Sequence, residues 1–559
     1  MRTRLALVSA LAPLSLIVAC SSSGTTRDTG TNNGNGNGTP ETPNNGNPNI
    51  GGNTNQKPEE KPSTGSGADP TTCADAEQFK SYLGCDFWPT ITYNPVDASF
   101  DFAAVISNPQ TVDANITVTG PNNFSKTLVV KPGEIGKLYL PWVDKLKTMP
   151  TSFLTGAVPT SLFVKAASYH LVSTVPVVAY QFNPLEYAAG GASGPAGKDW
   201  SKCVAAPGAD KCYSYSNDAS LLLPSSAMTG NYRIYGPAAN SATGAQGYSF
   251  AAITATKDST TLSIKLSATG NVAAGPGVTA TTSGGTMTLA MNAGDVALLQ
   301  TSSATSDLSG SLLKADKPLQ VITGSPCTYM PYNKQACDHV EESLFPAETL
   351  GKHYYIAPPT GPKGDVPGML VRLHGNVDNT QLTYLPSKPA GCPDTINAGQ
   401  SISCGNFGAT DAVIKSPFEV TGTHEFAASI YQLAGELTDP NATLYPQGDP
   451  SQSQPVAVEQ YRSSYSFLTP NDYAKSFVDI VSPTGTVLML DGAAVSVAPK
   501  AISSGYELRR LTLTNNNGGA HKLTGDKAFG IQVSGYGENT SYQYPGGLNL
   551  GVIASVPVQ

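Results

Sequence analysis

A phrase with two prolines thirteen residues apart recurs along this chain, and it constrains the fold more than any single motif. The phrases are LLLPSSAMTGNYRIYGP, LFPAETLGKHYYIAPP and FLTPNDYAKSFVDIVSP. Their first prolines, Pro224, Pro346 and Pro470, are 122 and 124 residues apart. The phrases share no charged or nucleophilic residue. The pattern therefore predicts a repeated piece of scaffold, made of a strand, a proline-started turn and a second strand, and not a site used three times.

The repeat extends to most of the chain. A degenerate copy begins at Pro89, and alternating runs such as Ile116–Thr119 and Leu262–Leu266 are typical of half-buried antiparallel strands. We expect an all-β fold of four tandem β-sandwich-like units of about 100–135 residues, each with about seven to nine short strands. A closed propeller-like ring is the alternative architecture. The expected units span residues 73–200, 201–325, 326–455 and 456–559.

The composition agrees with short strands joined by turns. The chain has 56 glycines and 43 prolines in 559 residues, and only 13% of its residues are charged. Residues 73–84 are the best candidate for a helix, and they predict only a short one. The formal net charge is −8, and loss of Arg2 and Arg4 with an N-terminal leader makes it −10. An acidic chain without a block of basic residues gives no electrostatic basis for nucleic-acid binding.

The N-terminus is typical of an export signal. In MRTRLALVSALAPLSLIVAC, two arginines precede an apolar run that is too short to span a membrane permanently. The ending IVAC resembles the lipobox of bacterial lipoproteins. This resemblance implies a signal peptide over residues 1–19 and lipidation of Cys20, which would anchor the chain to a membrane. Ser21, where an aspartate would retain the protein, favours the outer membrane of a Gram-negative-type bacterium. An ordinary secretory leader is the alternative.

Residues 20–72 predict a disordered tether. They are mostly Gly, Asn, Thr, Pro and Ser, and they contain no aromatic residue. Such a segment cannot bury enough apolar surface to offset the entropy lost on ordering. As a flexible coil of about 50 residues it reaches roughly 40 Å root-mean-square. We expect it to hold the folded part away from the bilayer.

The remaining eight cysteines form four close pairs, and an even number in an exported chain indicates disulfides. We expect neighbours to pair, because the two cysteines of each pair are about 10 residues apart and the pairs are distant from one another. Zinc-site spacing is absent, so we predict no metal and no other cofactor. The expected disulfides are Cys73–Cys85, Cys203–Cys212, Cys327–Cys337 and Cys392–Cys404.

Three longer phrases indicate a family. They are SYHLVSTVPVVAYQFNPLEY, CYSYSNDASLLLPSSAMTGNYRIYG and FGIQVSGYGENTSYQYPGGLNLGVI. Together they resemble the IgGFc-binding-protein N-terminal domain family, over most of residues 73–559. The resemblance implies an extracellular, β-rich, disulfide-stapled binding or adhesion module without enzymatic activity. It transfers no catalytic residue, and a relative need not share the IgG ligand.

No catalytic motif is present in the sequence. None of the six histidines lies in H-E-x-x-H, and neither a G-x-S-x-G elbow nor a phosphate-binding glycine loop occurs. His424 falls in an expected strand and is interpreted as a surface or strand histidine. A Ser/His/Asp set assembled by the fold stays open as an alternative.

Two polar groups are weighed as sites. Asp338, Glu341 and Glu342 lie close together after Cys337 and have the oxygen ligands that calcium prefers, but without a calcium-loop pattern we expect a solvated loop. Six tyrosines suit a sugar-stacking or protein-binding face, yet Tyr232 and Tyr354 keep a fixed offset from the repeat prolines, which favours core positions. The six are Tyr213, Tyr215, Tyr232, Tyr235, Tyr354 and Tyr355.

The sequence therefore predicts a cell-surface lipoprotein whose β-repeat ectodomain is a non-enzymatic binding or adhesion module. Its expected partners are the membrane, through Cys20, and an extracellular protein or glycan. The sequence identifies no ligand-binding residue. A secreted hydrolase of polysaccharide or peptide and a structural envelope component are the alternatives.

Overall fold

The computed structural model describes residues 69–147, 160–191, 194–205, 209–240, 248–334, 337–442, 444–471, 473–513 and 519–557. They all belong to one compact unit, Glu60–Gln559. The predicted signal peptide, the predicted lipidation site Cys20 and the predicted tether as far as residue 68 lie outside the described residues and stay predictions. Residues 69–72, which we assigned to the tether, are part of the folded body. There the Asp69 carboxylate accepts hydrogen bonds from Arg462 (2.6 Å) and Ser464 (3.0 Å).

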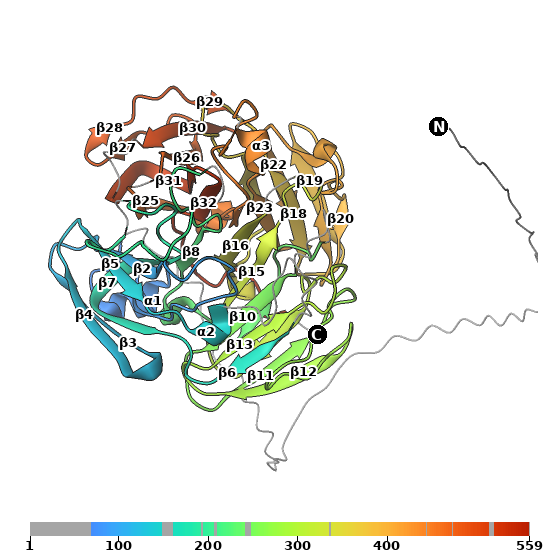
Figure 1. The fold of residues 1–559 in the computed structure, drawn as a ribbon. Coiled ribbons are helices and arrows are strands. Elements are labelled where there is room, and N and C mark those ends of the chain that lie inside the picture. Colours follow the sequence, from blue (N-terminus) through green and yellow to red (C-terminus); the bar gives the residue numbers. More distant parts are fainter. Residues whose placement is uncertain are drawn as a thin grey trace, which may run out of the picture. The chain divides into compact units, whose positions relative to one another are not determined.

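The predicted all-β class is confirmed (Figure 1). The described residues hold 32 strands in six sheets, and their α-helices are short: α1 (Cys73–Phe79), α2 (Asp144–Lys147) and α3 (Gly435–Thr438). Helix α1 begins at a capping box, in which the Thr72 hydroxyl accepts the Asp75 N–H and the Asp75 carboxylate accepts the Thr72 N–H, both at 3.1 Å.

The strands form four repeats of eight in chain order. Repeat 1 consists of β1 (Gly84–Phe87), β2 (Phe102–Ser107), β3 (Ala114–Gly120), β4 (Phe124–Val130), β5 (Ile135–Leu140), β6 (Leu162–Val164), β7 (His170–Asn183) and β8 (Asp218–Leu222). Repeat 2 consists of β9 (Asn231–Arg233), β10 (Phe250–Ala255), β11 (Thr260–Lys265), β12 (Thr286–Met291), β13 (Val296–Gln300), β14 (Leu312–Ala315), β15 (Leu319–Thr328) and β16 (Asp338–Ser343).

The second half of the chain repeats this arrangement. Repeat 3 consists of β17 (His353–Ile356), β18 (Leu370–Gly375), β19 (Thr380–Leu385), β20 (Thr395–Ile396), β21 (Ser401–Ser403), β22 (Phe418–Gly422), β23 (Phe426–Tyr431) and β24 (Gln452–Ser453). Repeat 4 consists of β25 (Arg462–Thr469), β26 (Lys475–Pro483), β27 (Leu488–Leu490), β28 (Ala493–Ala494), β29 (Lys500–Ala501), β30 (Tyr506–Leu513), β31 (Gly519–Gly537) and β32 (Thr540–Pro545).

Each repeat pairs its strands in the same order, as an inner and an outer sheet. The inner sheets run β8-β7-β2-β5, β16-β15-β10-β13, β24-β23-β18-β21 and β32-β31-β26-β30. The long strands β7 and β31 pair with strands of both sheets. In repeat 3 the two sheets enclose one core, to which Val371 and Ile430 come from the inner sheet and Leu382 and Val420 from the outer sheet. This is the sandwich-like packing that the alternating strands predicted.

The last strand of each inner sheet lies at the centre of the molecule. Contacts run from β8 to β16, from β16 to β24, from β24 to β32 and from β32 back to β8, and Figure 1 shows β8, β16 and β32 close together there. Apart from β6, which pairs with β13, each described strand pairs only within its own repeat. No propeller closure is found among the strands that the structure describes, so the alternative of a closed propeller-like ring is not supported.

The recurring proline phrase joins one repeat to the next. After Pro224 the 3-10 turn η3 (Ser225–Ala227) connects β8 to β9, and after Pro346 the turn η4 (Ala347–Thr349) connects β16 to β17, as predicted. The assignment of Pro470 is wrong, because that residue follows β25 within repeat 4. The third linker is η6 (Val458–Gln460), which begins after Ala457. The residue before this turn needs only an extended backbone conformation. Ala457 (φ −65°, ψ 146°) adopts that conformation although it lacks the ring that fixes φ in proline.

Strand pairing also places repeat boundaries. Strand β8 pairs with β7 of repeat 1, and β16 pairs with β15 of repeat 2. The boundaries expected at 200/201 and 325/326 would instead have assigned β8 to the second unit and β16 to the third. The linkers between repeats span residues 223–230, 344–352 and 454–461. The division into four domains stays a prediction, because the repeats share one compact unit.

Candidate binding surfaces

The four expected disulfides are formed between neighbouring cysteines. Cys73–Cys85 fastens α1 to β1, and Cys392–Cys404 closes a loop around β20. Cys203–Cys212 and Cys327–Cys337 close loops that lead into β8 and β16. These last two fix connections between the final two strands of a repeat. Loop closure of this length stabilises a fold by roughly 2–3 kcal/mol.

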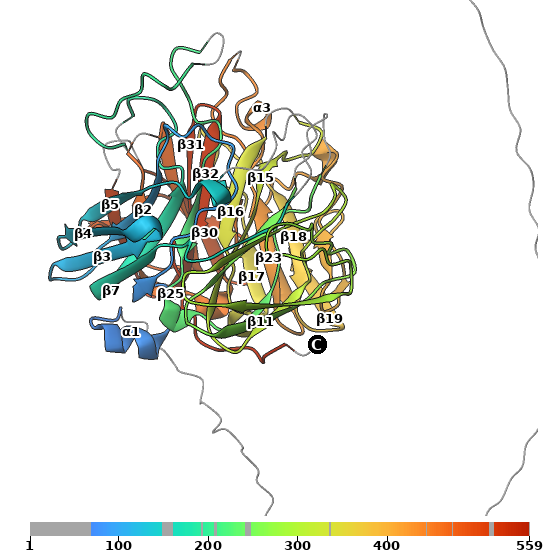
Figure 2. The same cartoon turned by 60° about the horizontal axis from the view of Figure 1, so that its bottom comes forward.

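The connections between the last two strands of the repeats lie at one end of the molecule. We call the described residues of 184–217, 329–337, 432–451 and 538–539 the loop face. Four described ion pairs lie on it or beside it: Lys198 with Asp101 (2.8 Å) and Glu186 (2.7 Å), Lys334–Glu436 at 2.9 Å and Lys363–Asp439 at 2.5 Å. Figure 2 shows α3 at this end and α1 at the opposite end, where the chain enters the folded body. The loop face is therefore the end away from the point at which the predicted tether joins.

Four tyrosines of the loop face gather with Tyr473, which lies beside it between β25 and β26. The Tyr213 ring lies 6.3 Å from that of Tyr187, 5.7 Å from Tyr215 and 5.8 Å from Tyr445, and Tyr187 lies 5.0 Å from Tyr473. We call these five residues the tyrosine cluster; they come from repeats 1, 3 and 4. Tyr213 and Tyr473 are buried, whereas the other three are partly exposed. Burial and hydrogen bonds to carboxylates raise the pKa of Tyr213.

Two carboxylates border this cluster. The Tyr213 hydroxyl donates to Asp210 Oδ1 at 2.8 Å and also contacts Glu538 Oε2. Asp210 is exposed and Glu538 is partly exposed. Lys211 places its Nζ 5.6 Å from the centre of the Tyr213 ring. The cluster therefore combines flat aromatic faces with negative charge, close to solvent.

The six tyrosines that the sequence offered as a binding face fall into two groups in the structure. Tyr232, Tyr235, Tyr354 and Tyr355 are core residues, as the fixed offset from the repeat prolines indicated for Tyr232 and Tyr354. Tyr213 and Tyr215 belong to the cluster. Tyr187, Tyr445 and Tyr473 were missed, because Tyr445 is more than 200 residues from Tyr213 and no local pattern connects them. Only the fold shows that Tyr187 and Tyr445 contact Tyr213, the residue after the loop closed by Cys203–Cys212.

The acidic group after Cys337 is not a solvated loop, and that expectation is wrong. Asp338, Glu341 and Glu342 lie on β16 and are at most 1% exposed. Glu341 accepts hydrogen bonds from Gln181 Nε2 (2.6 Å) and Asn183 Nδ2 (3.1 Å) of repeat 1. These partners come from the neighbouring strand β7, so the carboxylate joins two repeats. Among the described residues, no group of three or more His, Cys, Asp or Glu is arranged to hold a metal ion.

The acids of β16 belong to a central acidic hub, which consists of Asp218, Asp338, Glu342 and Asp449. Asp218 Oδ2 accepts the backbone N–H of Glu341 (3.0 Å) and of Gln452 (3.1 Å), and so bridges β8, β16 and β24. Neither carboxylate oxygen of Asp338 has a hydrogen-bond partner among the described residues. Burial raises the pKa of all four carboxyls, and the charge of Asp449 adds to the effect at Asp338.

Among the described residues, neither His374 nor His521 completes a Ser/His/Asp set in a pocket. His374 lies between the hydroxyls of Ser401 (2.7 Å) and Ser429 (3.0 Å) without a carboxylate. His521 contacts Asp491 (2.8 Å) and the buried hydroxyl of Thr469 (3.4 Å), but it lines neither the cavity nor the groove described next. His424 is exposed in the turn between β22 and β23.

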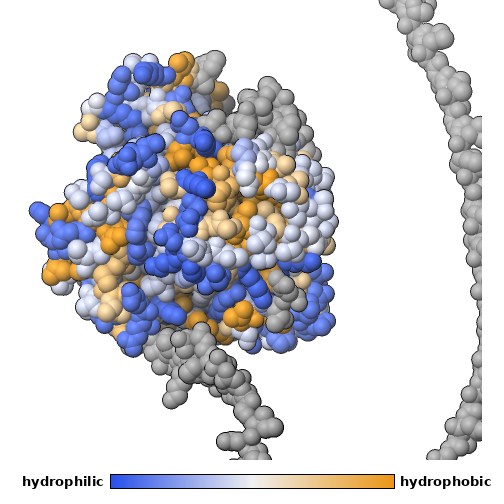
Figure 3. Space-filling view, turned by 90° about the horizontal axis from the view of Figure 1, so that it is seen from below, coloured by the Kyte–Doolittle hydropathy of each residue, from blue (hydrophilic) through white to orange (hydrophobic). Residues whose placement is uncertain are grey.

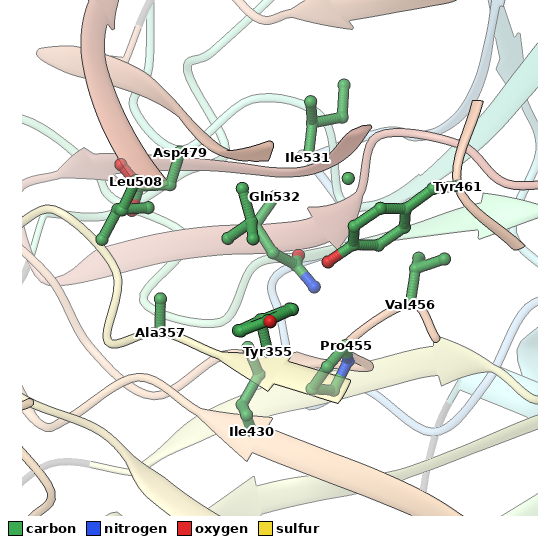
Figure 4. A pocket seen from close by; sticks show the side chains of 12 residues that line it. Tyr355, Ala357, Ile430, Pro455, Val456, Tyr461, Asp479, Leu508, Ile531 and Gln532 are labelled. Carbon is green, nitrogen blue, oxygen red and sulfur yellow. The ribbon is translucent and has the colours of Figure 1, made fainter. Parts of the chain in front are cut away.

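A small cavity lies between repeats 3 and 4 (Figure 4). Tyr355, Tyr461, Asp479 and Gln532 line it, and Figure 4 shows Tyr461 and Gln532 pointing toward each other. Its volume is about 30 Å³, room for one or two water molecules, whereas ligand pockets usually measure about 300–1,000 Å³. The Asp479 carboxylate is already held by Thr360 Oγ1 (2.6 Å) and Arg510 (2.7 Å). This cavity is part of the packing between repeats.

A larger groove, of about 850 Å³, lies between repeats 2 and 3. Arg233, Lys265, Lys352 and His424 line it together with the C-terminal residues 553–557. Figure 2 shows the C-terminus at the end that carries α1, so the groove opens away from the loop face. Arg233 donates to the carbonyls of Gly310 and Asn376, which tie the two repeats. The groove is the second candidate surface.

The flank between these ends carries no single dominant surface. Figure 3 shows hydrophobic and hydrophilic residues interspersed over the side that lies at the bottom of Figure 1, near β6, β11 and β12. Large apolar residues are exposed singly, among them Val129 on β4 at 55%. Such scattered residues are normal on a folded protein. No described helix is long and apolar enough to cross a membrane.

Comparison with known proteins supplies the family. The family model described as IgGFc binding protein matches residues 218–535, more than half of the chain. The chain belongs to this family. No curated protein and no solved structure matches it. The family is one of binding modules and not of enzymes.

The IgGFc-binding match is shorter than the resemblance seen in the sequence. It begins at Asp218, the first residue of β8 and a member of the central hub, and ends within β31. It includes the disulfides Cys327–Cys337 and Cys392–Cys404 but not the stapled loop 203–212. The tyrosine cluster is thus divided, since Tyr445 and Tyr473 lie inside the matched residues and Tyr187, Tyr213 and Tyr215 outside. Part of the loop face therefore lies outside the matched residues.

Proposed function

We propose that this chain is a lipid-anchored, non-enzymatic binding protein of the bacterial cell surface, and that its loop face binds an extracellular protein. Cys20 would be the anchor in the outer membrane and residues 20–68 the main part of the tether. The observation that carries the proposal is the position of the loop face, at the end opposite to the entry of the chain. A molecule held at the α1 end presents this face outward.

The construction of the loop face supports a binding role. Disulfides fix two of its loops, which reduces the entropy lost when a partner binds them. Tyrosine supplies large and rigid contact area with a polar tip, and it is favoured in binding surfaces for that reason. Membership in a family of binding modules agrees with this role. A glycan partner is an outcome that the experiment below can distinguish.

The anchor is tested in cells that express the full chain. In a Gram-negative host, wild type is expected in the outer-membrane fraction and to incorporate labelled fatty acid. Cys20→Ala is expected to lose the label and to leave the membrane fraction, because lipidation needs the thiol. Retention of Cys20→Ala in the outer membrane would contradict the anchor.

The binding face is tested with two matched disulfide variants of the full chain. Cells displaying wild type are expected to adhere to surfaces coated with extracellular-matrix or mucus proteins. The double variant Cys203→Ser, Cys212→Ser on the loop face is expected to lower adhesion about tenfold, since an unfastened loop loses its preorganisation. The control Cys73→Ser, Cys85→Ser loosens the α1 end and is expected to leave adhesion unchanged.

Two further arms decide between surfaces and partners. Lys265→Glu alters the groove between repeats 2 and 3 and leaves the loop face intact. If Lys265→Glu abolishes adhesion and the Cys203→Ser, Cys212→Ser variant does not, the loop face is not the binding surface. Adhesion that persists after the coated proteins are digested with protease, and disappears after removal of glycans, would show that the partner is a glycan.

A further inference from the structure

Two tyrosines of the cluster adopt an unfavourable backbone conformation. Tyr215 has φ 53° and Tyr445 has φ 54°, in the left-handed region that glycine and asparagine adopt most readily. A bulky side chain at such a position is an outlier, and outliers of this kind gather at functional sites. Both residues flank Tyr213, from loops of repeats 1 and 3. Tyrosine therefore occupies two positions where glycine or asparagine would adopt the backbone conformation at a lower energetic cost.

The electrostatics of the cluster favour a cation. The face of an aromatic ring is negative, and the rings of Tyr187 and Tyr445 both stack on that of Tyr213. The carboxylates of Asp210 and Glu538 add negative charge at the Tyr213 hydroxyl. One cation of the chain, Lys211, already lies over the Tyr213 ring. An anionic ligand would be repelled by both carboxylates.

Three further observations point the same way. The hydroxyl of Tyr215 is buried and has no hydrogen-bond partner among the described residues, so its oxygen can accept a hydrogen bond from an N–H donor. The whole chain is acidic, with a net charge of −8, which raises the encounter rate with a basic partner. Exposed Leu444 precedes Tyr445 in the chain and offers apolar contact to the stem of a long side chain.

We propose that the tyrosine cluster binds a lysine or arginine side chain presented by an extracellular protein, with the cationic head against the tyrosine rings and between Asp210 and Glu538. The proposal rests on the proposed function, because it places the partner on the same loop face. It names the chemistry of that partner, a basic segment of protein. The cluster itself is made from three repeats and so exists only in the folded chain.

The test titrates the full chain with three soluble probes: an acetylated tetra-lysine peptide, an acetylated tetra-glutamate peptide and the neutral sugar maltotetraose. Isothermal calorimetry measures each affinity at low and high salt. The lysine peptide is expected to bind, and to bind more weakly at high salt because exposed charges are screened. No binding of the lysine peptide, or tighter binding of either other probe, would overturn the proposal.

Variants then place the peptide on the cluster. Tyr445→Asn and Glu538→Gln are each expected to weaken lysine-peptide binding about tenfold, through loss of a ring face or of a charge. Asparagine tolerates the left-handed conformation, so the melting temperature of Tyr445→Asn is expected to stay at or above that of wild type. Glu77→Gln, on exposed α1 at the opposite end, is the matched control and is expected to bind like wild type.

These outcomes separate the two proposals. If adhesion depends on Cys203–Cys212 but lysine-peptide affinity is the same in wild type, Tyr445→Asn and Glu538→Gln, the loop face still binds a protein and the cationic assignment is wrong. If the peptide binds at the cluster while neither disulfide variant changes adhesion, the proposed function fails and the cation site remains.

Discussion

Carboxylates occur in two very different settings in this molecule. In the central hub, Asp218, Asp338 and Asp449 are at most 3% exposed. The Asp218 carboxylate accepts backbone N–H groups of other repeats, whereas the Asp338 carboxylate has no hydrogen-bond partner among the described residues. At the loop face, Asp210 and Glu538 lie near solvent and accept hydrogen bonds from the Tyr213 hydroxyl. The same chemical group therefore links repeats at the centre and sets the charge offered to a partner at the surface.

The largest expected effect comes from Asp218→Ala. This change removes the acceptor of three N–H groups, from Ala219, Glu341 and Gln452, and the last two come from other repeats and are left buried without that partner. Each such loss costs about 1–3 kcal/mol, so we expect the free energy of unfolding to fall by about 3 kcal/mol. Urea denaturation followed by tyrosine fluorescence measures it. A fall below about 1 kcal/mol would mean that the hub does not link the repeats.

The second expected effect is on the pH dependence of stability. Burial raises the pKa of Asp338 above its ordinary value of 3.8, and the facing carboxylates Asp449 and Asp218 act in the same direction. The folded state then holds the proton more tightly than the unfolded chain does. Its stabilising contribution is complete below pH 3.8 and is lost as the pH rises toward the raised pKa. Wild type is therefore expected to lose stability with rising pH over this range.

Asp338→Asn isolates this contribution. The amide mimics the protonated carboxyl and cannot ionise, so the variant is expected to be more stable than wild type at pH 8, by at least about 1 kcal/mol. Near pH 4 the advantage should disappear. Thermal melts from pH 4 to pH 8 measure the difference. Equal pH slopes in the two proteins would show that Asp338 does not titrate between these limits.

The features that local sequence determines were predicted well. Period-two alternation identified the strands, and in β3 Ile116 and Val118 are buried while Thr117 and Thr119 are exposed. Neighbouring cysteines found their partners because closing a short loop costs little entropy. The proline linkers at Pro224 and Pro346 were found because proline favours the extended backbone that precedes a turn.

The features that depend on distant contacts were not predictable. Three carboxylates close together on Asp338–Ser343 suggested a solvated loop, because most partners of the Glu341 carboxylate are distant in the sequence: Gln181 and Asn183 lie about 160 residues earlier in the chain. The linker at Ala457 lacks the proline that marks the others. The tyrosine cluster likewise joins residues of three repeats, and no spacing along the chain indicates that they meet.

The smallest expected effect on stability is that of Glu538→Gln, the same carboxylate-to-amide change as Asp338→Asn. The new amide keeps an oxygen that can accept the Tyr213 hydroxyl, and the site is partly exposed, so the free energy of unfolding should change by less than about 0.5 kcal/mol at any pH from 4 to 8. Lysine-peptide affinity should nevertheless fall, since the charge is gone. One substitution would then alter stability without a ligand, and the other would alter binding without a change in stability. A pH-dependent gain in stability for Glu538→Gln would instead place this residue with the buried carboxylates and remove the distinction between the two settings.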